Sequence, residues 1–194
     1  MDNKLSPAAF DGDRAAKKDK GFMIFGLKSW IKALELAEGQ KKSAGKYRYV
    51  VDGDATSGKI VLASDGSAVP GTERTRTEWS QIGKPARLAS IALRATKDEL
   101  EPTAPARIEY HFNVISSEAY LTVAGERLNS LGDAVYPSTI SDWARLGRPI
   151  EQALFQQLNA ARDYGNKNAE EITRAKMIKY GVIRKPRADE SAAA

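Results

Sequence analysis

The sequence predicts an α+β fold, with an antiparallel sheet in the middle of the chain, a helix before it and two or three helices after it. Three observations predict this fold. Residues 107–115 alternate apolar and polar side chains, as a half-buried strand does. Residues 27–34 and 150–161 instead repeat apolar side chains at helical spacing, and turn signals such as Asp65-Gly66 separate the short strand-like runs between them.

The composition predicts one domain between two flexible arms, because 194 residues with 42% hydrophobic side chains can bury one sizeable core. Residues 1–21 are rich in Pro, Gly, Asp and Lys, so we expect a flexible N-terminal arm. Its isolated Leu5 and Phe10 are expected to anchor the arm in apolar sites on another subunit. Residues 22–183 form the single α+β domain, and residues 184–194 form a basic and then Ala-rich C-terminal tail.

The domain is predicted to begin with a helix and a hairpin. The apolar repeat at residues 27–34 indicates the helix, and Gly39 stands where a left-handed residue would end it. Two β-branched and aromatic runs around a Gly/Asp/Ser turn predict strands at residues 47–52 and 59–63. Residues 72–77 alternate Thr with charged side chains, which favours an edge strand exposed on both faces.

The middle of the chain is predicted to hold a further helix and the clearest hairpin. Residues 86–97 carry apolar side chains at helical spacing, with Pro85 near the first helical position. Residues 101–105 contain two prolines and indicate a turn or linker. The alternating strand at 107–115 is then expected to pair with a return strand at 119–123.

The last third of the chain is predicted to consist of three helices. Ser141 is expected to cap a short helix that stops at Gly147. Pro149 is expected to start a second helix, which Gly165 closes. A third helix is predicted over residues 168–181, with Asn at its start and Gly at its end.

The composition also excludes several kinds of chemistry. Cysteine is absent, so the chain can form no disulfide, thiolate nucleophile or Cys-based zinc site. The single histidine, His111, shares the polar side of its strand with Glu109 and Asn113, and neither a nucleophile nor a second metal ligand accompanies it. We therefore predict no catalytic residue, no metal site and no cofactor.

One segment matches the spacing of a phosphate-binding loop. Residues 53–59 read G-x-x-x-x-G-K and follow a predicted strand. A working loop continues with Ser or Thr and a helix, whereas Ile60 and an apolar strand follow here, so a hairpin turn is the better interpretation. The segment also fails as a calcium loop, because Ala63 stands where a bidentate Glu is needed.

The chain carries no recognisable targeting or membrane segment. The early apolar cluster at residues 22–27 is shorter than a secretory core, and no run approaches the ~18 apolar residues of a membrane span. We expect no membrane partner, no secretion by a signal peptide, and a cytoplasmic or virion location.

The net charge of +5 is unevenly distributed. Residues 28–48 hold six basic side chains against two acidic ones, and residues 174–187 hold six basic side chains and no acidic one. Two basic segments on an otherwise acidic chain indicate surfaces that face a polyanion, and the bland alternative is ordinary solvated surface.

The first basic segment ends in Tyr47-Arg48-Tyr49, whose two tyrosines share a face if the segment is a strand. Such rings either stack on bases beside cations that meet phosphates, or pack on the protein core. In the second segment the last three cations lie beyond Gly181, where the helix no longer needs them. The residues predicted to contact nucleic acid are Lys41, Lys42, Lys46, Tyr47, Arg48, Tyr49, Arg174, Lys176, Lys179, Arg184, Lys185 and Arg187.

Three classes of protein fit these features. We favour a self-assembling structural protein of a nucleic-acid-containing particle, of the viral coat, capsid or phage-particle kind, whose partners are copies of itself and DNA or RNA. This choice depends on an analogy with arms that order by crossing onto neighbouring subunits. A stand-alone single-stranded nucleic-acid-binding protein is the first alternative, and a small enzyme without a recognisable motif is the second.

Overall fold

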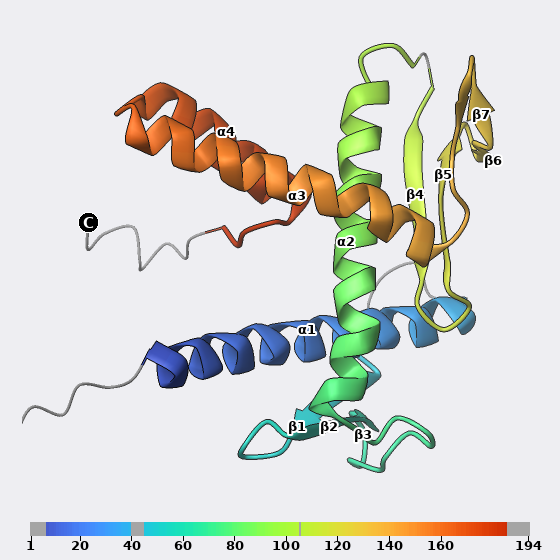
Figure 1. Ribbon diagram of the computed structural model, residues 1–194. Helices are drawn as coiled ribbons and strands as arrows, with labels where there is room; N and C mark the ends of the chain where they lie inside the picture. The colour runs from blue at the N-terminus through green and yellow to red at the C-terminus, as the bar shows by residue number, and fades with distance from the viewer. Residues whose placement is uncertain (1–6, 40–44, 105, 186–194) are drawn as a thin grey trace, which may run out of the picture. The chain divides into compact units, whose positions relative to one another are not determined.

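The computed structural model describes residues 7–39, 45–104 and 106–185, and for residues 7–16 it describes the backbone alone. This part of the chain forms four helices and three small antiparallel sheets, with the strands between the first and the last helices (Figure 1). The predicted α+β class is therefore confirmed. The chain divides into two compact units, residues 1–87 with 113–118 and residues 88–112 with 119–194, and each is described by itself.

The first unit combines a long helix with a three-stranded sheet. Helix α1 (Pro7–Ala37) is followed by strand β1 (Tyr47–Val51), which pairs antiparallel with β2 (Ser57–Leu62). The two-residue strand β3 (Arg74–Thr75) pairs with the other edge of β2, so the strand order is β1-β2-β3. The first half of helix α2 (Arg76–Leu100) completes the unit.

The core of the first unit joins α1, β2 and α2. Met23, Leu27, Ile60 and Trp79 are all completely buried and pack in one cluster. Trp79 also donates its indole N–H to the Gly58 carbonyl at 2.8 Å, so its one polar atom is satisfied inside the core. This cluster holds the helices on one face of the sheet.

Glycines allow α1 and α2 to cross in close contact. A Cβ atom on Gly83 would lie 1.9 Å from the Phe22 carbonyl oxygen, and one on Gly26 would lie 2.7 Å from the Trp79 carbonyl oxygen. Both obstacles are backbone atoms of a packed helix, which cannot rotate away. The crossing therefore needs glycine at both positions.

Most of a second sheet belongs to the second unit. This sheet contains β4 (Ile108–Asn113), β5 (Glu118–Val123) and β6 (Glu126–Arg127), in the order β4-β5-β6. The alternation predicted for residues 107–115 is visible here, because Ile108 is buried while its neighbours in sequence are exposed. A separate two-stranded hairpin follows, formed by β7 (Ser130–Leu131) and β8 (Ala134–Val135).

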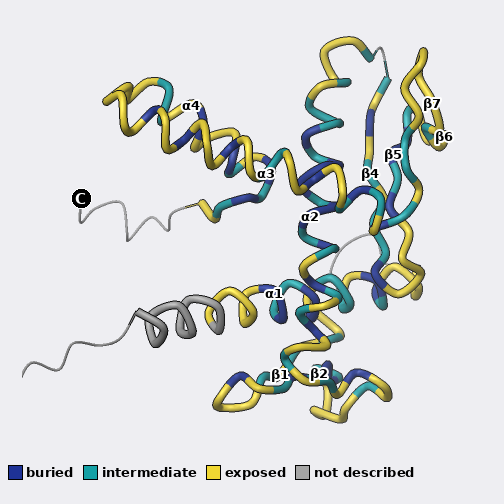
Figure 2. Tube along the Cα trace, viewed as in Figure 1, coloured by how far each residue is buried: buried dark blue, intermediate teal, exposed yellow. Residues whose placement is uncertain are grey.

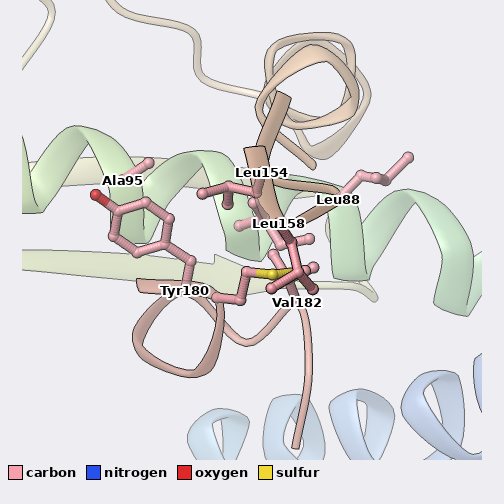
Figure 3. Close-up of a cluster of buried hydrophobic side chains, with 8 residues drawn as sticks. Leu88, Ala95, Leu154, Leu158, Tyr180 and Val182 are labelled. Carbon is pink, nitrogen blue, oxygen red and sulfur yellow. The ribbon is translucent and has the colours of Figure 1, made fainter. Parts of the chain in front are cut away.

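Two C-terminal helices lie side by side in the second unit, α3 (Ile140–Asp163) and α4 (Lys167–Tyr180) (Figure 1). Gly181, with φ of 77°, ends α4 in the left-handed conformation, at the position where the sequence predicts the end of this helix. Apolar side chains from α2, α3 and α4 meet in one buried cluster (Figure 3). Its members are Leu88, Ile91, Ala95, Leu154, Leu158, Met177, Tyr180 and Val182.

Gly147 lies inside α3, where the sequence pattern predicts a helix end. A Cβ atom there would lie 1.9 Å from the Leu88 carbonyl oxygen of α2, so this glycine serves a helix crossing and not a stop. Four residues earlier, Trp143 is completely buried and donates its indole N–H to the carbonyls of Ala119 and Pro137 at 2.9 and 3.0 Å. The two residues together fix α3 against α2 and β5.

Both internal prolines were predicted to start helices, and both predictions are wrong. Pro85 lies within α2 and Pro149 lies within α3. A proline inside a helix costs about 3 kcal/mol, so the helix continues only where both sides are held by packing. Trp79 and Ala89 are buried on either side of Pro85, and Trp143 and Leu154 on either side of Pro149.

Several helix and strand ends also differ from the predictions. Helix α1 begins at Pro7, within the segment predicted as a flexible arm; the Ser80 hydroxyl donates to the Asp19 carbonyl at 2.8 Å and holds that part of the helix. Thr139 and Asn166 cap α3 and α4 in place of the predicted Ser141 and Asn168.

The predicted edge strand at residues 72–77 is reduced to the two residues of β3, because α2 already begins at Arg76. Thr72 is buried and not exposed as an edge-strand residue would be. Its hydroxyl is satisfied there, because it donates to the Val69 carbonyl at 2.7 Å and accepts the Ile60 N–H at 3.1 Å. Within the described residues, no helix contains a stretch both long and apolar enough to cross a membrane.

Candidate nucleic-acid interface

The two tyrosines of β1 share a face, as the strand pattern predicts, and that face is turned toward the core of the first unit. Tyr47 and Tyr49 are half-buried and pack against the Met23–Leu27–Ile60–Trp79 cluster, while Arg48 between them is exposed. Which face of a strand turns inward depends on where α1 packs, so alternation alone could not decide it. This placement supports the core-packing interpretation of the two rings over base stacking.

Side chains of the protein also occupy the polar end of Tyr47. Its hydroxyl donates to the Glu38 carboxylate, which pairs with the Lys46 ammonium at 2.7 Å. The Lys46 ammonium lies 5.4 Å from the Tyr47 ring centroid. The hydrogen bond from Lys46 lowers the pKa of Glu38, and the same bond raises the pKa of Lys46. Lys46 is thus partly neutralised, and Lys41 and Lys42 lie outside the described residues.

The basic side chains of α4 have partners within the second unit. The Arg174 guanidinium contacts the Glu170 carboxylate at 3.0 Å, and Arg162 of α3 reaches the same carboxylate at 2.9 Å. The Lys176 ammonium lies 5.7 Å from the Tyr180 ring centroid. These cations brace the helical pair and are less available to a polyanion than their number suggests.

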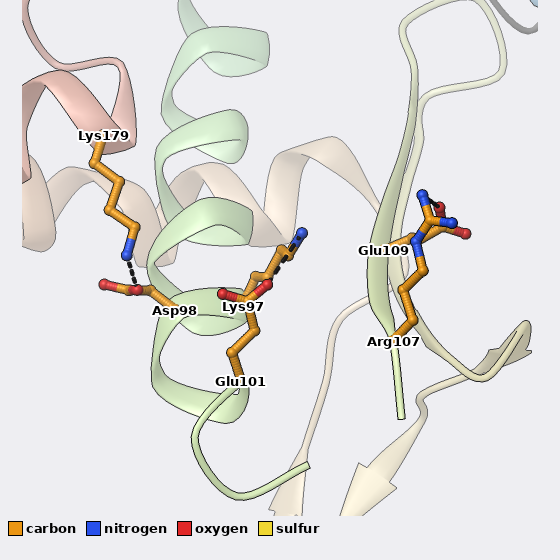
Figure 4. Close-up of polar contacts among 6 residues, drawn as sticks. All are labelled: Lys97, Asp98, Glu101, Arg107, Glu109 and Lys179. Carbon is orange, nitrogen blue, oxygen red and sulfur yellow. Dashed lines mark hydrogen bonds and ion pairs between the residues drawn. The ribbon is translucent and has the colours of Figure 1, made fainter. Parts of the chain in front are cut away.

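Lys179 joins α4 to α2. It forms an ion pair with the Asp98 carboxylate (Figure 4). The same carboxylate accepts a hydrogen bond from the Tyr180 hydroxyl at 2.8 Å. Hydrogen bonds from Lys179 and then from Tyr180 hold the pKa of Asp98 below its ordinary value. Burial, followed by the hydrogen bond with Asp98, raises the pKa of Tyr180.

The pKa shift of Asp98 predicts a pH-dependent effect of Asp98→Asn. A carboxyl group with a lowered pKa in the folded state contributes stability above its unfolded pKa and loses it as the pH falls through the folded value. The melting temperature of Asp98→Asn should therefore lie below that of the wild type at neutral pH, and the difference should shrink below about pH 4. Thermal unfolding across the pH series measures this difference.

Glu101→Gln is the matched control for that series. It removes the exposed ion pair between Glu101 and Lys97, which spans 3.3 Å one turn along α2 (Figure 4). An exposed pair of this kind contributes less than about 0.5 kcal/mol, so the control should unfold at nearly the wild-type temperature at neutral pH. A constant difference between Asp98→Asn and the wild type from neutral to acid pH would contradict the assigned role of Asp98.

Arg184 and Lys185 differ from the other predicted contacts. Both are exposed just beyond α4, and no hydrogen bond or ion pair within the described part of the chain involves either of them. Arg187 lies outside the described residues, as does Leu5, and the side chain of Phe10 is not described. Among the predicted residues, Arg184 and Lys185 are therefore the cations most available to nucleic acid.

Sequence reasoning missed one surface on the second sheet. The His111 and Tyr120 rings stack, with centroids 4.8 Å apart and planes at 17°, and the Arg127 guanidinium lies 4.2 Å from the Tyr120 ring centroid. The three side chains come from β4, β5 and β6. Only the registers of the β4–β5 and β5–β6 pairings bring them together. The turn at Ser116-Ser117 indicates the first hairpin but does not specify its register.

Large apolar side chains are also exposed outside the two cores. In the second unit they belong to the β7–β8 hairpin, to α3 and its C-cap, and to α4. They are Leu131, Val135, Leu146, Phe155, Tyr164 and Ile172. Figure 2 colours the chain by burial, with exposed residues in yellow. Contiguous apolar surface marks interaction sites, whereas single exposed apolar side chains are ordinary, and of these six residues Leu131 and Val135 belong to one hairpin.

Among the described residues, no group of three acidic or histidine side chains is placed to hold a metal ion. No protein-family model matches this chain, and neither a curated protein nor a solved structure is significantly similar to it.

Proposed function

We propose that the protein is a self-assembling structural component of a nucleic-acid-containing particle, of the viral coat or phage-particle kind. Its partners are copies of itself and nucleic acid, and its place is the virion or the cytoplasm in which the particle assembles. Two described surfaces support this proposal, one for each partner.

The β7–β8 hairpin carries the argument for self-association. Leu131 pairs with Ala134 and Ser130 pairs with Val135, so Leu131 and Val135 project on opposite faces of the hairpin. Both side chains are exposed, at 55% and 81%. An isolated two-stranded hairpin is marginally stable in water. A hairpin that exposes apolar side chains on both faces and has free outer edges gains stability when a neighbouring chain covers it.

The basic end of the described chain supports the second partner. Arg184 and Lys185 follow directly on the helix that Lys179 fixes to α2, and they have no acidic partner within the described residues. Exposed lysine and arginine side chains without acidic partners can neutralise phosphates, and each neutralised phosphate adds to the salt dependence of binding.

The double variant Leu131→Thr with Val135→Thr tests the proposal. Threonine is β-branched like valine and has high strand propensity, but it offers less apolar surface than valine or leucine, so the monomer should stay folded. Because it lacks the apolar cover, the variant should need at least about tenfold more protein to assemble, which corresponds to about 1.4 kcal/mol lost per contact. Light scattering of the full chain over a concentration series, with and without single-stranded nucleic acid, measures this threshold.

Val50→Thr is the matched control, because Val50 is an exposed strand valine of the first unit. It should assemble like the wild type. Replacing Arg184 and Lys185 by Gln should leave assembly without nucleic acid unchanged. With nucleic acid, the dependence of assembly on salt concentration should fall by the amount that about two neutralised phosphates contribute. A wild-type chain that stays monomeric at every concentration and salt but binds nucleic acid would overturn the proposal in favour of a stand-alone binding protein.

A further inference from the structure

Three side chains form a continuous row across the sheet β4-β5-β6. His111 and Tyr120 are stacked with their ring centroids 4.8 Å apart, and Arg127 places its guanidinium 4.2 Å from the Tyr120 ring centroid. His111 and Arg127 are exposed and Tyr120 is half-buried. The row is thus a preassembled set of flat groups that solvent can reach, since neighbouring side chains already hold the middle ring.

The polar groups around the row are largely occupied by one another. Glu109, two residues from His111 on β4, pairs with the Arg107 guanidinium at 2.8 Å (Figure 4). Glu126 lies opposite Val123 in the β5–β6 pairing. Val123 is three residues after Tyr120 on the same strand, so Val123 and Glu126 project on the face of the sheet opposite to Tyr120. Glu118, two residues before Tyr120 and on the same face of β5, accepts a hydrogen bond from the Ser116 hydroxyl at 2.8 Å. Arg127 is the cation in direct contact with the row.

One buried polar atom lies next to the row without a partner. Thr122 is directly opposite Arg127 in the β5–β6 pairing and shares a face with Tyr120. It is only 4% exposed, and its hydroxyl oxygen has no hydrogen-bond partner within the described part of the chain. Buried hydroxyls are normally satisfied, so the unpartnered Thr122 hydroxyl is an exception beside the row.

We propose that the His111–Tyr120–Arg127 row binds single-stranded nucleic acid by stacking a base on the exposed His111 ring, which Tyr120 supports from within the row. The proposal deepens the function argued above and depends on nucleic acid being a partner. Base stacking on aromatic side chains tolerates any sequence, because every base offers a flat face. Arg127 supplies N–H donors for the adjoining phosphate or base edge. Because a single cation contacts the row, binding here depends weakly on salt, in contrast to binding at Arg184 and Lys185.

The row contains its own reporter, because His111 is the only histidine of the chain and its imidazole protons give one isolated set of proton NMR signals. Titration of the full chain with oligoadenylate should shift these signals upfield in a saturable way, since a stacked purine adds its ring current. Inorganic tripolyphosphate, which has charge but no base, should leave them in place. A shift with tripolyphosphate equal to that with oligoadenylate would overturn the proposal.

Variants then identify the contribution of each residue. His111→Ala, Tyr120→Leu and Arg127→Gln should each weaken the binding of a labelled oligoadenylate at least about fivefold, as measured by fluorescence anisotropy in high salt. Tyr164→Leu is the matched control and should bind like the wild type, because Tyr164 is 88% exposed but lies at the end of α3. Circular dichroism checks that all four variants are folded. If the three row variants then bind oligoadenylate with the same affinity as the Tyr164→Leu control, the proposal is overturned.

The outcomes separate this inference from the proposed function. If the chain assembles with nucleic acid while the His111 signals do not respond to oligoadenylate, the row is not the binding site and the proposed function stands. If the signals respond while the chain stays monomeric under all conditions, the row stands and the assembly proposal fails. Signals that move only with protein concentration would show that the row contacts another copy of the chain, which also overturns the inference.

Discussion

Gly83→Ala is expected to lower the free energy of unfolding of the first unit by about 2–3 kcal/mol, in the range of overpacked cores. The added methyl group would lie 1.9 Å from the Phe22 carbonyl oxygen, far inside van der Waals contact. Neither backbone can yield without breaking the packing of α1 on α2. Alanine's higher helix propensity offsets at most about 1 kcal/mol of this cost. Thermal unfolding followed by circular dichroism should show a melting temperature lower by several degrees.

Gly21→Ala is the matched control for this prediction. Gly21 is also a helical glycine of the first unit, but no atom lies within 4 Å of the position of its Cβ. Alanine there should raise the stability by about 0.5–1 kcal/mol through helix propensity alone. A shift of the melting temperature in the same direction for both variants would contradict the close crossing of α1 and α2 at Gly83.

Trp143→Phe is expected to destabilise the second unit by about 3 kcal/mol. The smaller ring leaves a cavity in a completely buried position. It also removes the indole N–H that the carbonyls of Ala119 and Pro137 share, and an unsatisfied buried polar group costs about 1–3 kcal/mol. Urea unfolding followed by circular dichroism measures the loss.

Trp30→Phe provides the comparison, because Trp30 is only partly buried at the edge of the first core and meets Trp79 edge-on, with ring centroids 5.7 Å apart. Its replacement should cost less than half as much as that of Trp143. Equal effects of the two substitutions would show that ring volume alone, and not the shared indole hydrogen bonds, determines the cost.

Local sequence signals predicted the elements better than their ends. The alternation at residues 107–115 and the apolar repeat at residues 27–34 each report on a single strand or helix, so the sequence sufficed to predict them. Pro85 and Pro149 were interpreted as helix starts, because proline favours the first helical position, and Gly147 was interpreted as a helix stop. Their helices continue because α2 packs against residues far away in the sequence. A local sequence pattern cannot predict this stabilisation by distant packing.

The same distinction applies to the candidate surfaces. The availability of Arg184 and Lys185 could be predicted, since cations beyond the end of a helix have few local partners. The sharing of one face by Tyr47 and Tyr49 could be predicted too, but not that α1 covers this face. The row at His111 was missed because it needs the register of two hairpins, which residue types alone do not specify.

The glycines at the helix crossings also bear on how this sequence can change over evolution. At an open helical position such as Gly21, drift toward alanine costs nothing and adds stability. At Gly26, Gly83 and Gly147 the smallest possible side chain already meets a backbone atom, so no single substitution is tolerated without moving a helix. Divergent descendants of this chain should therefore keep these three glycines after their surface charges have been exchanged, and the three positions offer a signature for finding them.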